Sequence, residues 1–75
     1  MAARSQLNLR GLIMPLALLK CKSRLETMGK GDVLEVIVGD GDVAGDLTLI
    51  VGRSRDRIAY KRENRDGFFL GIEKG

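Results

Sequence analysis

The sequence predicts an α/β fold with the element order β-α-β-α-β-β and both helices on one face of the sheet. Three observations point to it: helical spacing of apolar residues over 15–28, a β-branched run over 33–38, and two strand-like segments around an Asp-Gly pair. A chain of 75 residues is expected to form one domain, 1–75, with a compact core.

The first element is a short strand that leads into a loop. Leu7 and Leu9 alternate with polar neighbours, which predicts a strand over 5–9. Arg10 and Gly11 are expected to end this strand. The next few residues then turn into a helix.

That helix is amphipathic and is predicted over 15–28, with Pro15 in its first turn. Gly29 and Gly31 are expected to end it. At about 100° per residue, five side chains fall along one apolar stripe that is expected to face the core. They are Met14, Leu18, Cys21, Leu25 and Met28.

An inner strand and a second helix come next. Residues 33–38 carry a single charge, Glu35, and are expected to form an inner strand. The segment GDGDVAGD predicts a turn in which Asp40 or Asp42 caps a helix. The following LTLIV has helical spacing in context, although alone it could equally be a strand.

The last two strands are predicted to form a hairpin. Residues 57–63 and 68–73 have strand-like patterns, and the Asp-Gly pair between them is a hairpin signal. Phe68 and Phe69 are expected to pack in the core, which leaves too few aromatic rings for stacking on nucleic-acid bases.

Residue counts exclude several kinds of site. The chain has one cysteine and no histidine, which excludes an internal disulfide, a zinc cluster and any catalytic group that needs imidazole. No metal or cofactor is expected, and a reducing cytoplasm fits best. The apolar run before Cys21 contains Pro15 and is too short to span a bilayer, so it is expected to belong to the fold rather than to a signal peptide or membrane segment.

The aspartate-rich turn does not have the ligands of a calcium loop. Asp40, Asp42 and Gly45 have the spacing of that loop's first two ligands and its glycine. Ala44 and Val51 occupy positions that require oxygen ligands, so the oxygen count is too small. The lysine followed by Ser or Thr of a phosphate loop is also absent.

Basic residues are concentrated on the first predicted helix and in the second half of the chain. The formal net charge is +3, a mild bias that favours encounter with acidic partners. A solvated basic face is expected rather than direct nucleic-acid binding, with a small RNA-binding domain as an alternative. The residues assigned to this face are Lys20, Lys22, Arg24, Arg53, Arg55 and Arg57.

The segment LNLRGLIMPLALLK resembles the signature of the TusA/SirA-like sulfur carriers, which runs Leu-Asp-x-x-Gly-Leu-x-Cys-Pro-x-Pro before a helix. Leu7, Gly11, Leu12 and Pro15 match, and Asn8 stands where aspartate is usual. GKGDVLEVIVGD and FFLGIEK are similar to the family's second and last strands. The resemblance covers nearly the whole chain and implies a two-layer α/β (α+β) sandwich with a mixed four-stranded sheet.

The chain departs from this signature at its centre, where Met14 occupies the position of the family's cysteine and Ala17 replaces the second proline. The family's cysteine lies at a helix N-terminus, where the helix dipole favours a thiolate, and it carries sulfur as a persulfide. A thioether has no proton to lose and cannot form a persulfide. The resemblance therefore implies a family member without a catalytic residue, expected to act as a binding or regulatory module in a sulfur relay.

Cys21 is the alternative sulfur carrier. It lies seven residues after Met14, about 10 Å further along the helix axis and beyond the turn that the helix dipole influences. Its place in the apolar stripe predicts a buried, inert thiol, whereas the neighbouring Lys20 and Lys22 favour the reactive alternative.

The expected partner is another protein, either a sulfur-relay component or a cysteine-containing relative. Leu16 and Leu19 point roughly opposite the core stripe, where polar residues would be expected. An apolar patch at the N-terminal half of the helix suits a partner surface. The contact region is assigned to Arg10, Gly11, Met14, Pro15, Leu16 and Leu19.

Overall fold

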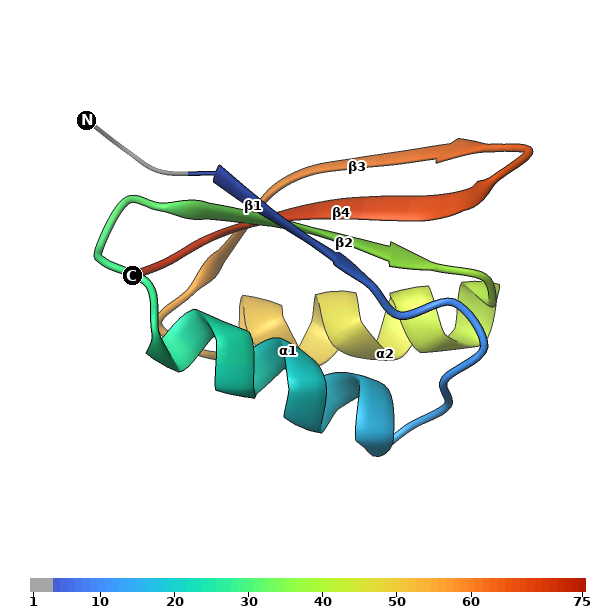
Figure 1. Cartoon of the computed structure of the whole chain (residues 1–75), viewed down its shortest axis with the longest axis horizontal. Helices are drawn as coiled ribbons and strands as arrows, with labels where there is room; N and C mark the ends of the chain where they lie inside the picture. Colours follow the sequence, from blue (N-terminus) through green and yellow to red (C-terminus); the bar gives the residue numbers. More distant parts are fainter. Residues whose placement is uncertain (1–3) are drawn as a thin grey trace.

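The computed structural model describes residues 4–75 and confirms the predicted element order. The strands are β1 (Arg4–Asn8), β2 (Val33–Val38), β3 (Arg57–Asn64) and β4 (Gly67–Glu73), and the helices are α1 (Leu16–Glu26) and α2 (Gly41–Gly52). Both helices lie on the same face of the sheet, and within the described residues no helix covers the opposite face (Figure 1). Neither helix of this part of the chain is long and apolar enough to cross a membrane.

The four strands form one mixed sheet in the order β1-β2-β4-β3. β1 pairs with β2 in parallel, and β4 pairs antiparallel with both β2 and β3. β2 and β4 are therefore the inner strands, as the β-branched run of β2 predicts.

Alternate residues of the inner strands point toward the helices and form the core. Because neighbouring strand residues point to opposite faces, Leu34, Val36 and Val38 of β2 all point toward the helices. Each fully buried side chain of this kind contributes about 1.5–3 kcal/mol. The largest fully buried side chains of the described residues are Leu9, Leu34, Leu47, Leu70, Ile72, Val36, Val38 and Cys21.

Helix α1 is shorter than predicted at both ends. It begins at Leu16, with Pro15 as its N-cap residue, and ends at Glu26 before either glycine. Thr27 closes the last turn because its hydroxyl donates to the Arg24 carbonyl at 2.7 Å and its backbone N–H bonds the same turn. Thr27 is therefore the C-cap residue of α1, and both glycines lie beyond it.

The apolar stripe of α1 lies against the sheet, with one addition. Cys21 and Leu25 are fully buried, while the other three predicted members, at 14, 18 and 28, are half-buried and pack against the core. Ala17 is fully buried and was not placed in the stripe. Its small side chain allows the first turn of α1 to approach the sheet closely.

Helix α2 is capped by one of the two predicted aspartates. Asp40 is the N-cap, and its side chain accepts a hydrogen bond from the Asp42 backbone N–H at 2.7 Å. Asp42 itself lies in the first helical turn, where the helix dipole favours a negative charge. The segment LTLIV is helical, which resolves the ambiguity of its sequence.

The two phenylalanines of the hairpin pack on opposite faces of the sheet. Phe68 packs against the helix-facing core, as predicted. Phe69 is buried but lies on the helix-free face, because adjacent residues of a strand point to opposite sides. Gly67 has a φ of 139°, and a Cβ there would lie 2.6 Å from the Val38 carbonyl oxygen.

Candidate functional site

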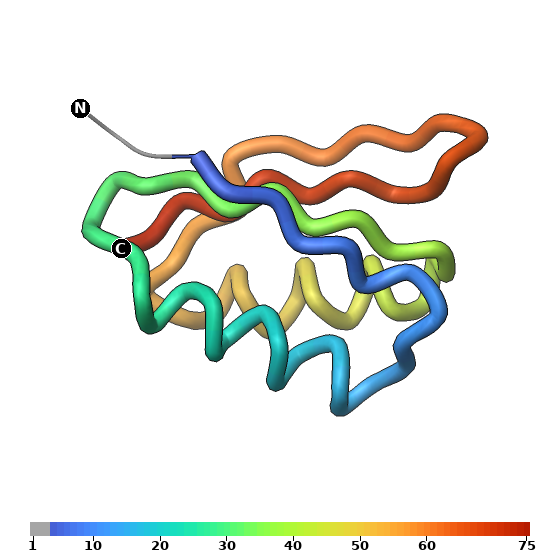
Figure 2. The backbone as a smooth tube through the Cα atoms, viewed as in Figure 1, coloured from blue at the N-terminus to red at the C-terminus, as the bar shows by residue number. Residues whose placement is uncertain are grey.

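The connection between β1 and α1, residues 9–15, holds the centre of the predicted contact region. It runs beside the turn from β2 to α2 (Figure 2). The Leu9 backbone N–H donates to the Ile37 carbonyl at 2.8 Å, and the Arg10 guanidinium donates to the Asp66 carbonyl at 3.3 Å. The connection is therefore held against both β2 and the β3–β4 turn.

Two residues shape the start of this connection. The Asn8 side-chain oxygen accepts hydrogen bonds from the backbone N–H and the Nε of Arg10, at 3.0 and 3.2 Å. Gly11 has a φ of 87°, a conformation that favours glycine, and the chain turns there. The Asn8 amide oxygen therefore stabilises the turn that follows β1.

Met14 lies between the exposed loop and the helix. Its side chain is half-buried and packs against the core, and the Met14–Pro15 peptide bond is cis. The first turn of α1 contains no acidic residue. The residue at position 14 is therefore adjacent to the positive end of a helix, but its thioether cannot ionise.

Three exposed apolar side chains lie at or just before the N-terminal half of α1 and are named here the apolar patch: Ile13, Leu16 and Leu19. They are 71%, 45% and 59% exposed, respectively. The Ala17 backbone N–H donates to the Ile13 carbonyl at 3.0 Å, so helical spacing extends back to residue 13. At this spacing of three residues the side chains are neighbours on one surface. Ile13 was missed from the sequence because it precedes the predicted helix, although it continues the spacing of the other two.

Cys21 lies in the core rather than at a surface. Its exposure is 0%. Burial, reinforced by the negative charge of Asp56, raises the pKa of the thiol to about 11. At neutral pH, only about one molecule in 10⁴ would carry the nucleophilic thiolate.

The six residues of the predicted basic face are spread over several places: four border two separate hollows, and two border neither of these. Lys20 and Arg24 border a hollow beside Leu7, on the β1 side of α1. Lys22 and Arg53 border another hollow between the C-terminal parts of the two helices. Arg55 is exposed in the connection between α2 and β3. Arg57 instead forms an ion pair with Glu73 at 2.7 Å.

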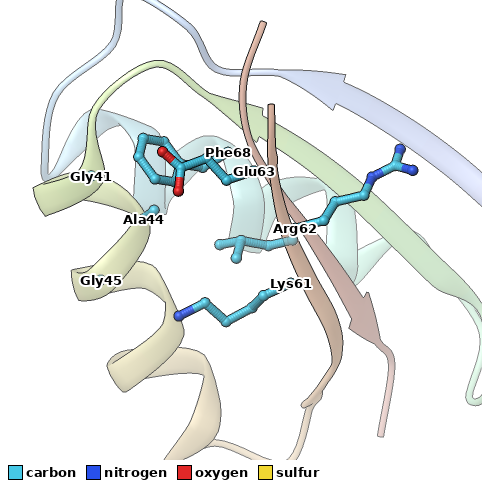
Figure 3. A pocket seen from close by; sticks show the side chains of 8 residues that line it. Gly41, Ala44, Gly45, Lys61, Arg62, Glu63 and Phe68 are labelled. Atoms are coloured by element: carbon cyan, nitrogen blue, oxygen red, sulfur yellow. The ribbon is translucent and has the colours of Figure 1, made fainter. Parts of the chain in front are cut away.

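A separate groove of about 260 Å³ lies between α2 and the β3–β4 hairpin. Figure 3 shows the Lys61 ammonium extending toward Gly45 and the Glu63 carboxylate beside Phe68, while Arg62 points away from α2. None of the predicted contact residues lines this groove.

The described residues offer surfaces for binding rather than a set of metal ligands. Among residues 4–75, no three His, Cys, Asp or Glu side chains come together in a way that could hold a metal ion. The apolar patch, by contrast, presents apolar side chains to solvent that a binding partner could cover.

The chain is similar to proteins of one known family. The family model for the sulfurtransferase TusA matches residues 5–74. The chain is 35% identical over 63 residues to two Neisseria meningitidis proteins named as candidate sulfur carriers, one from serogroup A strain Z2491 and one from serogroup B strain MC58. In each case the match covers 84% of this chain and 84% of the relative.

Proposed function

Because this chain belongs to the TusA sulfurtransferase family, we propose that it is a non-catalytic binding or regulatory module of a sulfur relay. The observation that carries this proposal is that the chain's single thiol, Cys21, is fully buried. Residue 14, where the family signature places its cysteine, is a methionine. The fold is kept, while the group that would carry a persulfide has been lost.

The proposed contact region is the predicted one, Arg10, Gly11, Met14, Pro15, Leu16 and Leu19, extended by Ile13. Its centre is the apolar patch, whose side chains gain free energy when a partner removes them from water. The connection beneath it is fixed by hydrogen bonds to β2 and to the β3–β4 turn. A surface held in place in this way loses little conformational entropy on binding.

The proposed partner is a protein of the sulfur relay, such as a cysteine desulfurase or a cysteine-containing relative of this chain, in the cytoplasm. The basic residues around α1 add a mild attraction for an acidic partner. RNA binding is less well supported, because the Arg62 guanidinium lies 4.7 Å above the Phe69 ring and occupies the place of a stacking base.

The loss of sulfur transfer is tested with a cysteine desulfurase and free cysteine. After incubation, persulfides are trapped by alkylation, and the intact mass and peptide map are measured. We expect no added sulfur on this chain, while a cysteine-containing relative treated in parallel gains one sulfur atom. Sulfur found on Cys21 would instead assign carrier activity to that residue and refute the proposal.

The contact region is tested by placing a charge in the apolar patch. Leu16→Glu is expected to weaken binding to the desulfurase or to the cysteine-containing relative by about tenfold or more, since buried anchors at the centre of an interface each contribute about 2 kcal/mol. Binding is measured by isothermal titration calorimetry. Leu49→Glu is the matched control, because Leu49 is also exposed but lies on α2. Equal affinities for the two variants would contradict the proposed surface.

A further inference from the structure

A row of four residues in register crosses the helix-free face of the sheet: Gln6 on β1, Glu35 on β2, Gly71 on β4 and Tyr60 on β3. Gly71 has no side chain, so the Tyr60 ring lies across β4 and its hydroxyl donates to Glu35 on the next strand. The Gln6 amide donates to the other carboxylate oxygen at 2.8 Å. The Glu35 side chain is only 7% exposed.

This row holds an ionised carboxylate beneath the surface. The hydrogen bond from Tyr60 is the main cause that lowers the pKa of Glu35, with further contributions from Gln6 and Arg62. Buried carboxylates are stable when their oxygens accept hydrogen bonds, as both do here. The single charge within an otherwise apolar inner strand was the sequence signal for this feature.

Two arginines lie beside the row, and each contacts it at a long hydrogen-bond distance. Arg62 lies over the Phe69 ring, and its Nη2 is 3.4 Å from Glu35 Oε2. Arg4 Nη2 is 3.4 Å from the Tyr60 hydroxyl. Both distances are at the long limit of hydrogen bonding, and a guanidinium has five N–H donors. Spare donors therefore remain on each side of the row.

The space between these groups is a hollow of about 530 Å³, lined by Arg4, Ser5, Gln6, Glu35 and Arg62. The Glu35 side chain is only 7% exposed, whereas the Arg62 side chain is 59% exposed. An approaching molecule therefore meets the two guanidinium groups first. The cluster of one carboxylate and two guanidiniums also has a net positive charge.

We propose that this hollow is an anion-binding site in which Arg4 and Arg62 hold a small oxyanion of the phosphate or sulfate class, free or attached to a small molecule. Guanidinium groups bind such anions through paired charge-assisted hydrogen bonds. Tyr60 and Gln6 each donate a hydrogen bond to one oxygen of Glu35, and these bonds reduce the repulsion between the Glu35 carboxylate and the anion. Glu35 in turn keeps Arg62 near the hollow before the anion arrives.

The test is a titration of the ¹⁵N-labelled chain with inorganic phosphate, followed by NMR at constant ionic strength. The Nε–Hε signals of Arg4 and Arg62 are expected to shift together and to saturate. Arg62→Gln is expected to weaken the affinity about tenfold, the loss of one charge-assisted interaction. Arg53→Gln removes the same charge outside the hollow and is expected to leave the affinity unchanged.

Two results would overturn the site. One is chemical-shift changes that rise with phosphate concentration without saturating, and the other is an equal loss of affinity from Arg62→Gln and Arg53→Gln. Both would indicate diffuse attraction of phosphate to the net charge of the chain. Unchanged helix amide signals show that a variant is folded, and Arg4→Gln at the sheet edge provides a second variant. Glycerol 3-phosphate is titrated in parallel. Tighter binding of this ester supports an attached oxyanion, and equal or weaker binding supports a free one.

Discussion

Replacing Met14 by cysteine, with Cys21 changed to serine, is expected to give the chain a reactive thiol. Residue 14 directly precedes Pro15, the N-cap of α1, where the helix dipole favours a thiolate. Even an unshifted thiol with a pKa of about 8.5 would be ionised roughly 300-fold more often at pH 7 than Cys21, whose pKa is about 11. The rate of iodoacetamide labelling of the folded protein measures this difference.

The same variant is expected to accept sulfur from a cysteine desulfurase, because the proposed contact region around residue 14 is otherwise unchanged. The matched control is Met14→Ser with Cys21 retained, which shortens the same side chain without adding a thiol. That control should neither label quickly nor gain sulfur. If the thiol introduced by Met14→Cys labelled no faster than Cys21 of the unmodified chain, the helix terminus would not activate a thiol here, and the residue at position 14 would not account for the lost chemistry.

The fold could be predicted from the sequence because local pattern and global packing agree. The β-branched run of β2 lies on an inner strand, and the Asp-Gly pair lies in the β3–β4 turn. The cap of α2 was predicted as well, since Asp40 is one of the two aspartates expected there. The end of α1 was not, because the helix ends at Glu26, before the glycines that were expected to end it.

The candidate site could be predicted only in part, for a different reason. Leu16 was found because it lies in the predicted helix, where helical spacing places it away from the core. Ile13 has the same spacing but precedes that helix, and only the structure shows that the helical turn extends back to it. The Glu35 row depends on the sheet order, since Tyr60 and Glu35 meet only because Gly71 lies on the strand between them. A sequence does not state which strands become neighbours.

Replacing Gly71 by alanine is expected to lower the free energy of unfolding by about 2–4 kcal/mol. A Cβ at this position would overlap the Tyr60 ring, so the ring must leave β4. Its hydroxyl then no longer reaches Glu35, and a buried carboxylate loses a charge-assisted hydrogen bond in addition to the packing strain. Urea unfolding measures the difference.

Gly45→Ala is the matched control for this change. Gly45 is exposed within α2, and a Cβ there meets no atom within 4 Å, so the substitution is expected to stabilise the chain by about 0.5–1 kcal/mol. In a Tyr60→Ala background the penalty at Gly71 is expected to fall below about 1 kcal/mol, because the overlapping ring has been removed. A penalty that persisted there would place the strain elsewhere in the sheet.

The pH dependence of the Gly71→Ala penalty identifies the lost hydrogen bond. In the unmodified chain, the hydrogen bond from Tyr60 lowers the pKa of Glu35. The bond therefore stabilises the fold fully above the unfolded carboxyl pKa of about 4.3. This stabilisation is lost as the pH falls through the lower pKa of the folded state. Burial and the contact with Glu35 raise the pKa of Tyr60, so the contribution also fades as the pH rises above about 10. The penalty is therefore expected to be largest between these limits and to shrink toward both, whereas packing strain alone would leave it constant with pH.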